Sequence, residues 1–324
     1  MAIRADELID RRRLRRKLTF WRIAALFIAA VAIVFASVWL VGDEFGKAAP
    51  HIAKVRIEGT ITEDDELIKR LEEIRKSSAV RGVILAIDSP GGTTAGGEQI
   101  FEEVRRVAAD KPVVAQVGTL AASAGYMIAS ASDHIVARKS SIVGSIGVLV
   151  QYPDVTGLMD KLGIKLEEVK SSPLKAEPSP FNPTTDEERA MLRSMILDSY
   201  DWFIGIVSER RQMPRAEVTA LADGSIYTGR QALTKKLVDA LGGEQEAVDW
   251  LATKGVDPKL DIVEWKPKNE DSGWIFSESL ANAVARWLGV PENGADLIRE
   301  LGGERIFLDG LLSVWHPDAG SWGK

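Results

Sequence analysis

The chain has 324 residues, of which 45% are apolar, contains no cysteine and carries a net charge of −6. That apolar fraction supplies a sizeable core and excludes a disordered protein, and the lack of cysteine excludes disulfide frameworks and thiolate metal sites. The charge is uneven, because residues 1–22 hold eight Lys and Arg against three Asp and Glu, a net +5 that leaves −11 on the rest. An acidic main body argues against nucleic acid as a partner.

An apolar stretch follows this basic tail. Residues 23–42 are 20 consecutive residues without a charge, the length that a helix needs to cross a bilayer. The positive-inside rule keeps the tail in the cytoplasm and delivers the remainder of the chain to the other side of the membrane. A cleaved signal peptide is the alternative, but the stretch is longer than an ordinary h-region and no small-x-small cleavage site follows it. We predict an uncleaved single-pass anchor, a linker at 43–50 and a soluble domain from His51.

Strand-like and helix-like runs alternate in the soluble part. The predicted strands are 52–57, 80–87, 112–117, 134–137 and 145–151. The predicted helices are 64–76, 98–107, 122–131, 184–212 and 244–254. The helix from 184 opens with a Thr185–Glu188 capping box, and its apolar stripe is interpreted as core: Met191, Met195, Tyr200, Phe203, Ile206 and Val207. The series predicts an α/β fold with a largely parallel sheet covered by helices.

Ser123 is the candidate nucleophile. It stands between a predicted strand and a predicted helix, among small residues from Gly118 to Ala129. A serine at such a turn points its hydroxyl over the end of a sheet, beside unpaired N–H groups of the first helical turn that can hold an oxyanion. Small neighbours let a substrate backbone approach. A helix N-cap among packing alanines is the more ordinary interpretation of such a serine.

A second signal lies upstream, where an apolar strand enters the glycine-rich turn 88–97. Backbone N–H groups are left exposed at the start of the helix that follows. The turn contains neither a Gly-Lys-Ser/Thr sequence nor a GxGxxG sequence, which excludes the common phosphate-binding loops.

Together the two stretches resemble the signal peptide peptidase A family, membrane-anchored bacterial serine proteases related in fold to the Clp protease and crotonase group. The resemblance covers residues 52–243 and includes five motifs in the family's order. They are Asp88-Ser89-Pro90-Gly91-Gly92, Ala122-Ser123-Ala124-Gly125-Tyr126, Gly144-Ser145-Ile146-Gly147-Val148, Lys175-Ala176-Glu177-Pro178-Ser179-Pro180, and Asp223-Gly224 through Ala232. The first two occur once each, so the chain resembles the short form of the family rather than the tandem form.

The resemblance implies a Clp protease/crotonase-like core of repeated β-β-α turns over residues 51–254. It implies that Ser123 attacks the scissile carbonyl, that Lys175 is the general base, and that backbone N–H groups of Gly92 and Ala124 hold the oxyanion. Burial in an apolar pocket lowers the pKa of a lysine, and the neutral amine can then accept a serine proton. No metal or organic cofactor is needed. Asp88 is not catalytic in the family and is interpreted as a turn-capping residue.

The family also suggests partners. Its members cleave remnant signal peptides and other membrane-associated peptides, and in short forms neighbouring protomers of a ring supply the serine and the lysine. We therefore expect peptide substrates, a membrane and a homo-oligomer whose isolated monomer is inactive. Residues 255–324 match the family less clearly, and their amphipathic run at 277–288 is interpreted as a packing or oligomer contact.

Three other functions stay open. His316 lies downstream of Ser123, as in membrane-tethered Ser-His-Asp esterases of α/β-hydrolase type, although Ala121 stands where their nucleophile elbow has glycine. A crotonase-type acyl-CoA enzyme would share the fold but has no evident cofactor supply outside the cytoplasm. A catalytically inactive oligomeric membrane scaffold would keep every fold motif. Of the remaining histidines, His51 is expected at the surface and His134 begins a strand.

Overall fold

The computed structural model describes residues 20–28, 30–31, 47–267 and 312–314. Residues 20–28 and 30–31 are helical. Within these described ranges, no helix is both long enough and apolar enough to cross a membrane. Much of the predicted anchor 23–42, the whole run 277–288 and His316 lie outside the described residues, so the anchor and the run stay predictions.

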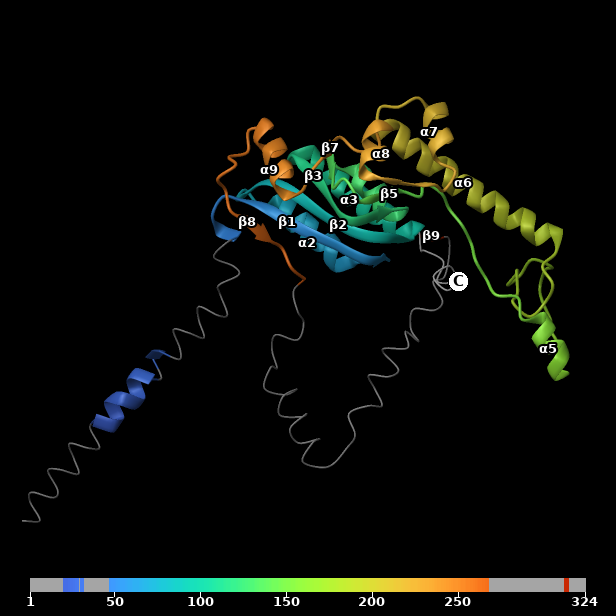
Figure 1. The fold of residues 1–324 in the computed structure, drawn as a ribbon. Helices are drawn as coiled ribbons and strands as arrows, with labels where there is room; N and C mark the ends of the chain where they lie inside the picture. The colour runs from blue at the N-terminus through green and yellow to red at the C-terminus, as the bar shows by residue number, and fades with distance from the viewer. Residues whose placement is uncertain (1–19, 29, 32–46, 268–311, 315–324) are drawn as a thin grey trace, which may run out of the picture.

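Three long parallel strands form the centre of the sheet (Figure 1). They are β1 (His51–Ile61), β2 (Val80–Thr93) and β3 (Val113–Ala122), with β2 between the other two. Parallel neighbours need a crossover connection, and here helices α2 (Asp65–Lys76) and α3 (Thr94–Asp110) supply it. This arrangement confirms the predicted β-α-β-α series.

Shorter strands extend this centre into one mixed sheet. Beyond β3 lie β4 (His134–Ala137), β5 (Ile142–Gly144), β6 (Ile226–Thr228) and β7 (Ala240–Leu241), and beyond β1 lies β8 (Ile262–Glu264). The first half of β3 pairs with β4 and its last residues pair with β5. Strand β9 (Leu312–Val314) runs antiparallel to the end of β2. The strand predicted at 145–151 is wrong, because β5 ends at Gly144 and irregular backbone follows.

Alternating side chains of the strands supply two cores, one on each face of the sheet. On one face Ile52, Ile84, Val114 and Val136 pack under α9 (Glu244–Thr253). On the other face the strands pack against α2, α3, α4 (Ala124–Ala131) and the C-terminal half of α6 (Asp186–Arg210). Helix α4 is buried along its whole length, as its run of small and apolar residues requires. It is therefore held on all sides.

A projecting arm contrasts with this body. It consists of α5 (Thr156–Leu162), the segment 163–185 and the N-terminal part of α6, and it extends away from the sheet (Figure 1). Helix α6 begins with the predicted Thr185–Glu188 capping box. Two short helices, α7 (Arg215–Leu221) and α8 (Gly229–Thr234), pack near the other end of α6. Several apolar side chains of the arm are exposed: Leu158, Leu162, Ile164, Leu166, Val169 and Phe181.

His51 is buried, so the surface role expected for it is wrong. Its side chain lies against Trp265, whose indole N–H donates to His51 Nε2 at 3.0 Å. An indole nitrogen can only donate, so Nδ1 carries the proton and donates to the Ala49 carbonyl oxygen at 2.7 Å. This pair fixes the start of β1 to the chain that follows β8.

Candidate active site

Ser123 lies at the turn between β3 and α4 in a strained backbone conformation. Its φ is 58° and its ψ is −121°, a region that a non-glycine residue seldom adopts and that costs of order 1–3 kcal/mol. Ser123 occupies the N-cap position of α4, but its side chain forms no capping hydrogen bond. The backbone is held on both sides, since Ser123 N donates to Gly144 O at 2.8 Å and Met127 N donates to Ser123 O at 2.9 Å. Strain of this kind is kept where the surroundings enforce it, as at catalytic residues.

The edge of β2 beside Ser123 is left open by β3. The last pairing of β3 with β2 is Ala121 to Ser89, after which the chain turns through Ser123 into α4. On its other side β2 stays paired with β1 as far as Gly92. Strand β9 pairs antiparallel with Gly91, Gly92 and Thr93, and β1 occupies one edge there, so β9 takes the edge that β3 has left. An extended chain segment can therefore lie beside Ser123.

The backbone donors predicted for an oxyanion lie at two neighbouring helix starts. Gly92 immediately precedes Thr93, the N-cap of α3, and Ala124 is the first residue of α4. The two helices pack closely at these ends, because a Cβ added to Gly97 would lie 3.1 Å from Ala124 Cβ. A Cβ added to Gly92 would lie 1.7 Å from the Ile61 carbonyl oxygen, so only glycine fits there. The Ala124 N–H is a first-turn group, the kind of donor that an oxyanion needs, and the Gly92 N–H lies just before the start of α3.

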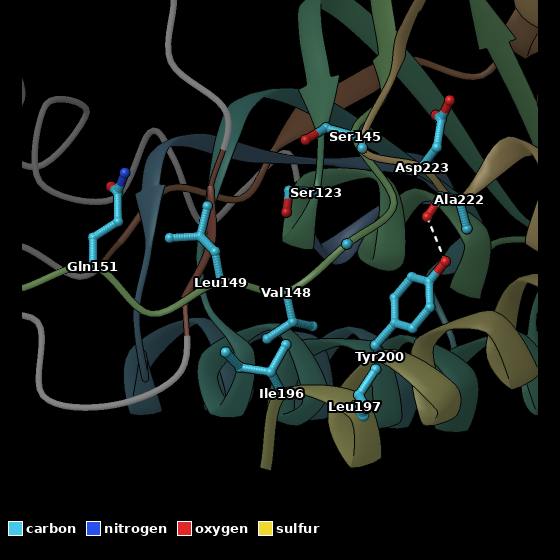
Figure 2. Close-up of a pocket in the computed structure, with 12 residues that line it drawn as sticks. Ser123, Ser145, Val148, Leu149, Gln151, Ile196, Leu197, Tyr200, Ala222 and Asp223 are labelled. Carbon is cyan, nitrogen blue, oxygen red and sulfur yellow. Dashed lines mark hydrogen bonds between the residues drawn. The ribbon is translucent and has the colours of Figure 1, made fainter. Parts of the chain in front are cut away.

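A pocket of about 540 Å³ opens next to Ser123. In Figure 2, Ser123 and Ser145 lie on one side of it, Val148 and Leu149 cross it, and Ile196, Leu197 and Tyr200 of α6 form the opposite wall. The remaining lining residues are Gly147, Gln151, Ala222, Asp223 and Gly224. The lining is mainly aliphatic, so it suits an apolar side chain of a peptide rather than a charged group.

Two ionisable side chains border the pocket and have shifted pKa values. Burial raises the pKa of Tyr200, with a further contribution from the charge of Asp223, and the Tyr200 hydroxyl donates to the Ala222 carbonyl oxygen at 2.6 Å (Figure 2). Hydrogen bonds from Ser225 lower the pKa of Asp223. At neutral pH the pocket therefore holds a neutral phenol and a carboxylate at its rim.

Comparison with known proteins adds to this geometry. The Clp protease family matches residues 52–143, and peptidase family S49 matches residues 105–257. A protein of Enterococcus faecium, provisionally named signal peptide peptidase SppA, is 31% identical over 269 residues, which cover 79% of this chain and 77% of that protein. The chain belongs to the signal peptide peptidase A family, peptidase family S49. It is a serine protease with a Clp protease-like α/β fold.

Two further relatives agree with this assignment. A provisionally named protease of Synechocystis is 35% identical over 248 residues, which cover 75% of this chain and 89% of that protein. Protease 4 of Haemophilus influenzae is 32% identical over 271 residues, which cover 77% of this chain but only 44% of that protein. The chain therefore spans most of the length of the Synechocystis relative and less than half of the length of the Haemophilus influenzae relative.

Lys175 does not line the pocket of Ser123 within the described part of the S49 protease. It lies in the arm, its side chain is exposed, and its backbone N–H donates to Ser172 O at 3.1 Å. Lys170, another lysine of the arm, forms ion pairs with Glu168 and Glu177. The hydrogen bonds that Lys170 donates to these two carboxylates raise the pKa of Lys170, which makes it a poor base. Lys175 is not tied in this way by any ion pair among the described residues.

The remaining predicted sites are accounted for as follows. His134 does not line the pocket and is stacked on Trp250 of α9, with ring centroids 5.0 Å apart. Among the described residues, no group of three or more acidic, histidine or cysteine side chains is placed to hold a metal ion. Whether His316 approaches Ser123 is outside the described residues.

Ser145 and the α6 wall are the site residues that the sequence did not single out. Ser145 has a φ of 52° and is buried beside Ser123. Its signal was the motif Gly144-Ser145-Ile146-Gly147-Val148, which was used for the family resemblance without a role for Ser145. The α6 stripe was interpreted wholly as core. Phe203, Ile206 and Val207 are buried as predicted, but Met195 is 47% exposed and Tyr200 faces the pocket.

Proposed function

We propose that this S49 protease is a membrane-anchored endopeptidase in which Ser123 and Lys175 form a catalytic dyad, and that it degrades remnant signal peptides or other membrane-associated peptides. The observation that carries the proposal is the strained Ser123 at the strand-to-helix turn, buried beside an apolar pocket and the edge of β2 on which β9 pairs. A serine held in this way serves nucleophilic attack better than packing.

The mechanism follows from acyl transfer. The neutral Lys175 amine takes the Ser123 proton as Oγ attacks the scissile carbonyl, and the backbone N–H groups of Gly92 and Ala124 hold the oxyanion. The proton then passes to the leaving amine, which departs and leaves an ester on Ser123. Lys175 next takes a proton from water, the resulting hydroxide attacks the ester, and the proton returns to Ser123 Oγ as the acid product leaves.

Lys175 is proposed to reach Ser123 from a neighbouring copy of the chain. The arm that carries Lys175 projects away from the sheet (Figure 1). Apolar side chains between Leu158 and Phe181 are exposed on it. Exposed apolar side chains on an extended element favour contact with another protein surface. In a closed ring, each arm can pack against the neighbouring protomer. In such a ring every site takes Ser123 from one protomer and Lys175 from the next, so a monomer lacks half of the dyad.

The substrate is proposed to bind as an added strand. Strand β9 indicates how, because it lies antiparallel on Gly91–Thr93 at the edge beside Ser123. A peptide in the same place would gain main-chain hydrogen bonds and could send one apolar side chain into the pocket of Val148, Leu149 and Ile196. Apolar signal-peptide segments suit such a pocket. Removal of Leu312 to Lys324 should therefore lower the KM for peptides that compete for this edge.

The anchor is proposed from residues 23–42, with the basic tail in the cytoplasm and the protease domain on the extracytoplasmic side of a bacterial inner membrane. This placement would keep the site near membrane-associated peptides.

Peptide hydrolysis tests the proposed function. Ser123→Ala and Lys175→Ala should each abolish cleavage of an apolar signal-peptide substrate while the oligomer, measured by sedimentation, stays intact. Full activity of Lys175→Ala would remove lysine from the mechanism, and full activity of Ser123→Ala would overturn the assignment of the nucleophile.

A further inference from the structure

Strand β2 shifts its register against both neighbours within the short stretch from Ile87 to Gly91. Against β1, the pairing passes from Glu58–Asp88 directly to Thr60–Gly91. Against β3, it passes from Ile87–Val117 directly to Ser89–Ala121. Backbone groups that are skipped at such irregularities lose their partners in the ladder and must be satisfied in another way. Both shifts lie just before the two segments that carry Gly92 and Ser123.

The Ser89 hydroxyl supplies hydrogen bonds at the register shift between β2 and β1. It is fully buried, donates to the Gly59 carbonyl oxygen at 2.6 Å, and accepts from the Gly91 N–H at 3.1 Å. Gly59 is the residue that the β1 pairing skips. One hydroxyl therefore ties the end of β1 to the turn that leads into Gly92.

The Asp88 carboxylate accepts hydrogen bonds at the register shift between β2 and β3. Its two oxygens accept from the N–H groups of Leu120 at 3.1 Å and Thr119 at 3.3 Å. These donors belong to the stretch of β3 that the pairing skips, three and four residues before Ser123. A carboxylate that accepts backbone N–H groups makes strong, charge-assisted hydrogen bonds. Asp88 thus fixes the approach to the nucleophile rather than capping its own turn.

The start of α4 rests on the same residue. A Cβ added to Gly125 would lie 3.0 Å from the Ser89 carbonyl oxygen and 3.4 Å from Ser89 Cβ. Ser89 therefore contacts the second residue of α4, which adjoins Ala124. Its side chain holds the turn before Gly92, and its backbone supports the turn that presents Ala124.

From this we infer that Ser89 is a positioning residue for the oxyanion site, because it fixes the Gly92 N–H relative to Ser123 and Ala124. Asp88 in the same way positions the end of β3 that leads into Ser123. The inference rests on the proposed roles of Ser123, Gly92 and Ala124. Oxyanion donors stabilise a transition state only when they point at the atom on which negative charge develops. A small displacement of these donors therefore destabilises the transition state more than it weakens substrate binding.

The test compares Ser89→Ala with Ser132→Ala in the full-length oligomer. Ser132 is the control, because its buried hydroxyl also contacts two backbone groups, the carbonyl oxygens of Ala129 at 2.7 Å and His134 at 2.9 Å, at the opposite end of α4. For Ser89→Ala we expect kcat per folded active site to fall by about 10- to 100-fold with little change in KM. A peptide boronate, which mimics the tetrahedral intermediate, should lose affinity by a similar factor.

A purely structural role gives a different result. Ser89→Ala and Ser132→Ala would then both lower the melting temperature and the amount of folded enzyme, with kcat per active site unchanged; that outcome overturns the inference. If Ser89→Ala does not fold, Ser89→Cys keeps the shape with a weaker hydrogen-bonding group and should show a smaller fall in kcat and in boronate affinity, whereas wild-type values would again overturn it. Activity in Ser123→Ala would instead overturn the proposed function.

Discussion

The two halves of the proposed dyad lie in regions of opposite character. Ser123 is 1% exposed and sits between a central strand and a fully buried helix, with backbone hydrogen bonds on both sides. Lys175 has an exposed side chain in an arm that leaves the body, where Val169 and Leu162 are also open to solvent. One chain therefore holds the proposed nucleophile and the proposed oxyanion donors in fixed positions but presents Lys175 outward. Assembly would then act as the switch that completes the site.

The largest effect is expected from removal of the proposed base. If activity survived this change, the contrast between a buried serine and an outward-facing lysine would have no bearing on catalysis. Lys175→Ala should lower kcat by about 10⁴-fold, because dyad members act as a unit and loss of either removes most of the catalysis. Lys170→Ala is the control from the same arm, and it should keep most of the activity because Lys170 is paired with Glu168 and Glu177. Both are measured by peptide hydrolysis at saturating substrate. Equal losses in the two variants would mean that the arm, not one lysine, matters.

A glycine in the fixed body should give the next largest effect. Gly92→Ala places a Cβ 1.7 Å from the Ile61 carbonyl oxygen, so β2 must shift away from β1. We expect a fall in kcat of about 10²- to 10³-fold from the misplaced oxyanion donor. Thermal unfolding of the variant should also occur at lower temperature, since overpacking costs about 1–3 kcal/mol. Gly157→Ala is the control, because nothing lies within 4 Å of a Cβ there.

An intermediate effect should come from the apolar surface of the arm. Val169→Asp and Leu162→Asp should weaken self-association by about tenfold or more, because a buried charge at an interface is costly. Activity should then depend on protein concentration while the melting temperature of the body is kept. Leu233→Asp, on the body, is the control. Sedimentation velocity checks the assembly, and unchanged association would place the arm outside the interface.

The smallest effect is expected on the far side of the body. Burial lowers the pKa of His134 below its usual 6.5, so the unfolded chain binds a proton that the folded chain resists. Stability must therefore fall as the pH drops from about 6.5 through the lowered folded pKa. His134→Gln should lose less thermal stability than wild type between about pH 7 and about pH 5. An equal loss in both proteins would assign the acid sensitivity to other groups.

Local pattern sufficed for much of the fold and for the strand-to-helix turn at Ser123. The β-branched runs, the Thr185–Glu188 capping box and the small residues around Ser123 each determine their structure within a few residues, and these predictions are confirmed. Features that depend on tertiary contacts could not be predicted from the local sequence pattern. The double register shift of β2 depends on three strands at once. Met195 follows the same helical stripe as Phe203, yet the sheet ends before it reaches Met195, which stays exposed.

His51 illustrates the same limit from the other side. A histidine near a charged linker suggests a surface position, but its partner Trp265 lies more than two hundred residues away and no local pattern connects them. Ser145 was missed because its role depends on lying beside Ser123 in a pocket whose opposite wall is α6.

The most direct test of the central claim is complementation between inactive subunits. Ser123→Ala and Lys175→Ala proteins are dissociated, mixed in equal amounts and reassembled, and peptide hydrolysis is measured against each variant alone. If each site draws its serine and lysine from different protomers, random mixing should restore about a quarter of the wild-type activity, since half of the serines and half of the lysines remain. If the dyad forms within one chain, the mixture stays as inactive as its parts, and the shared-site account is contradicted.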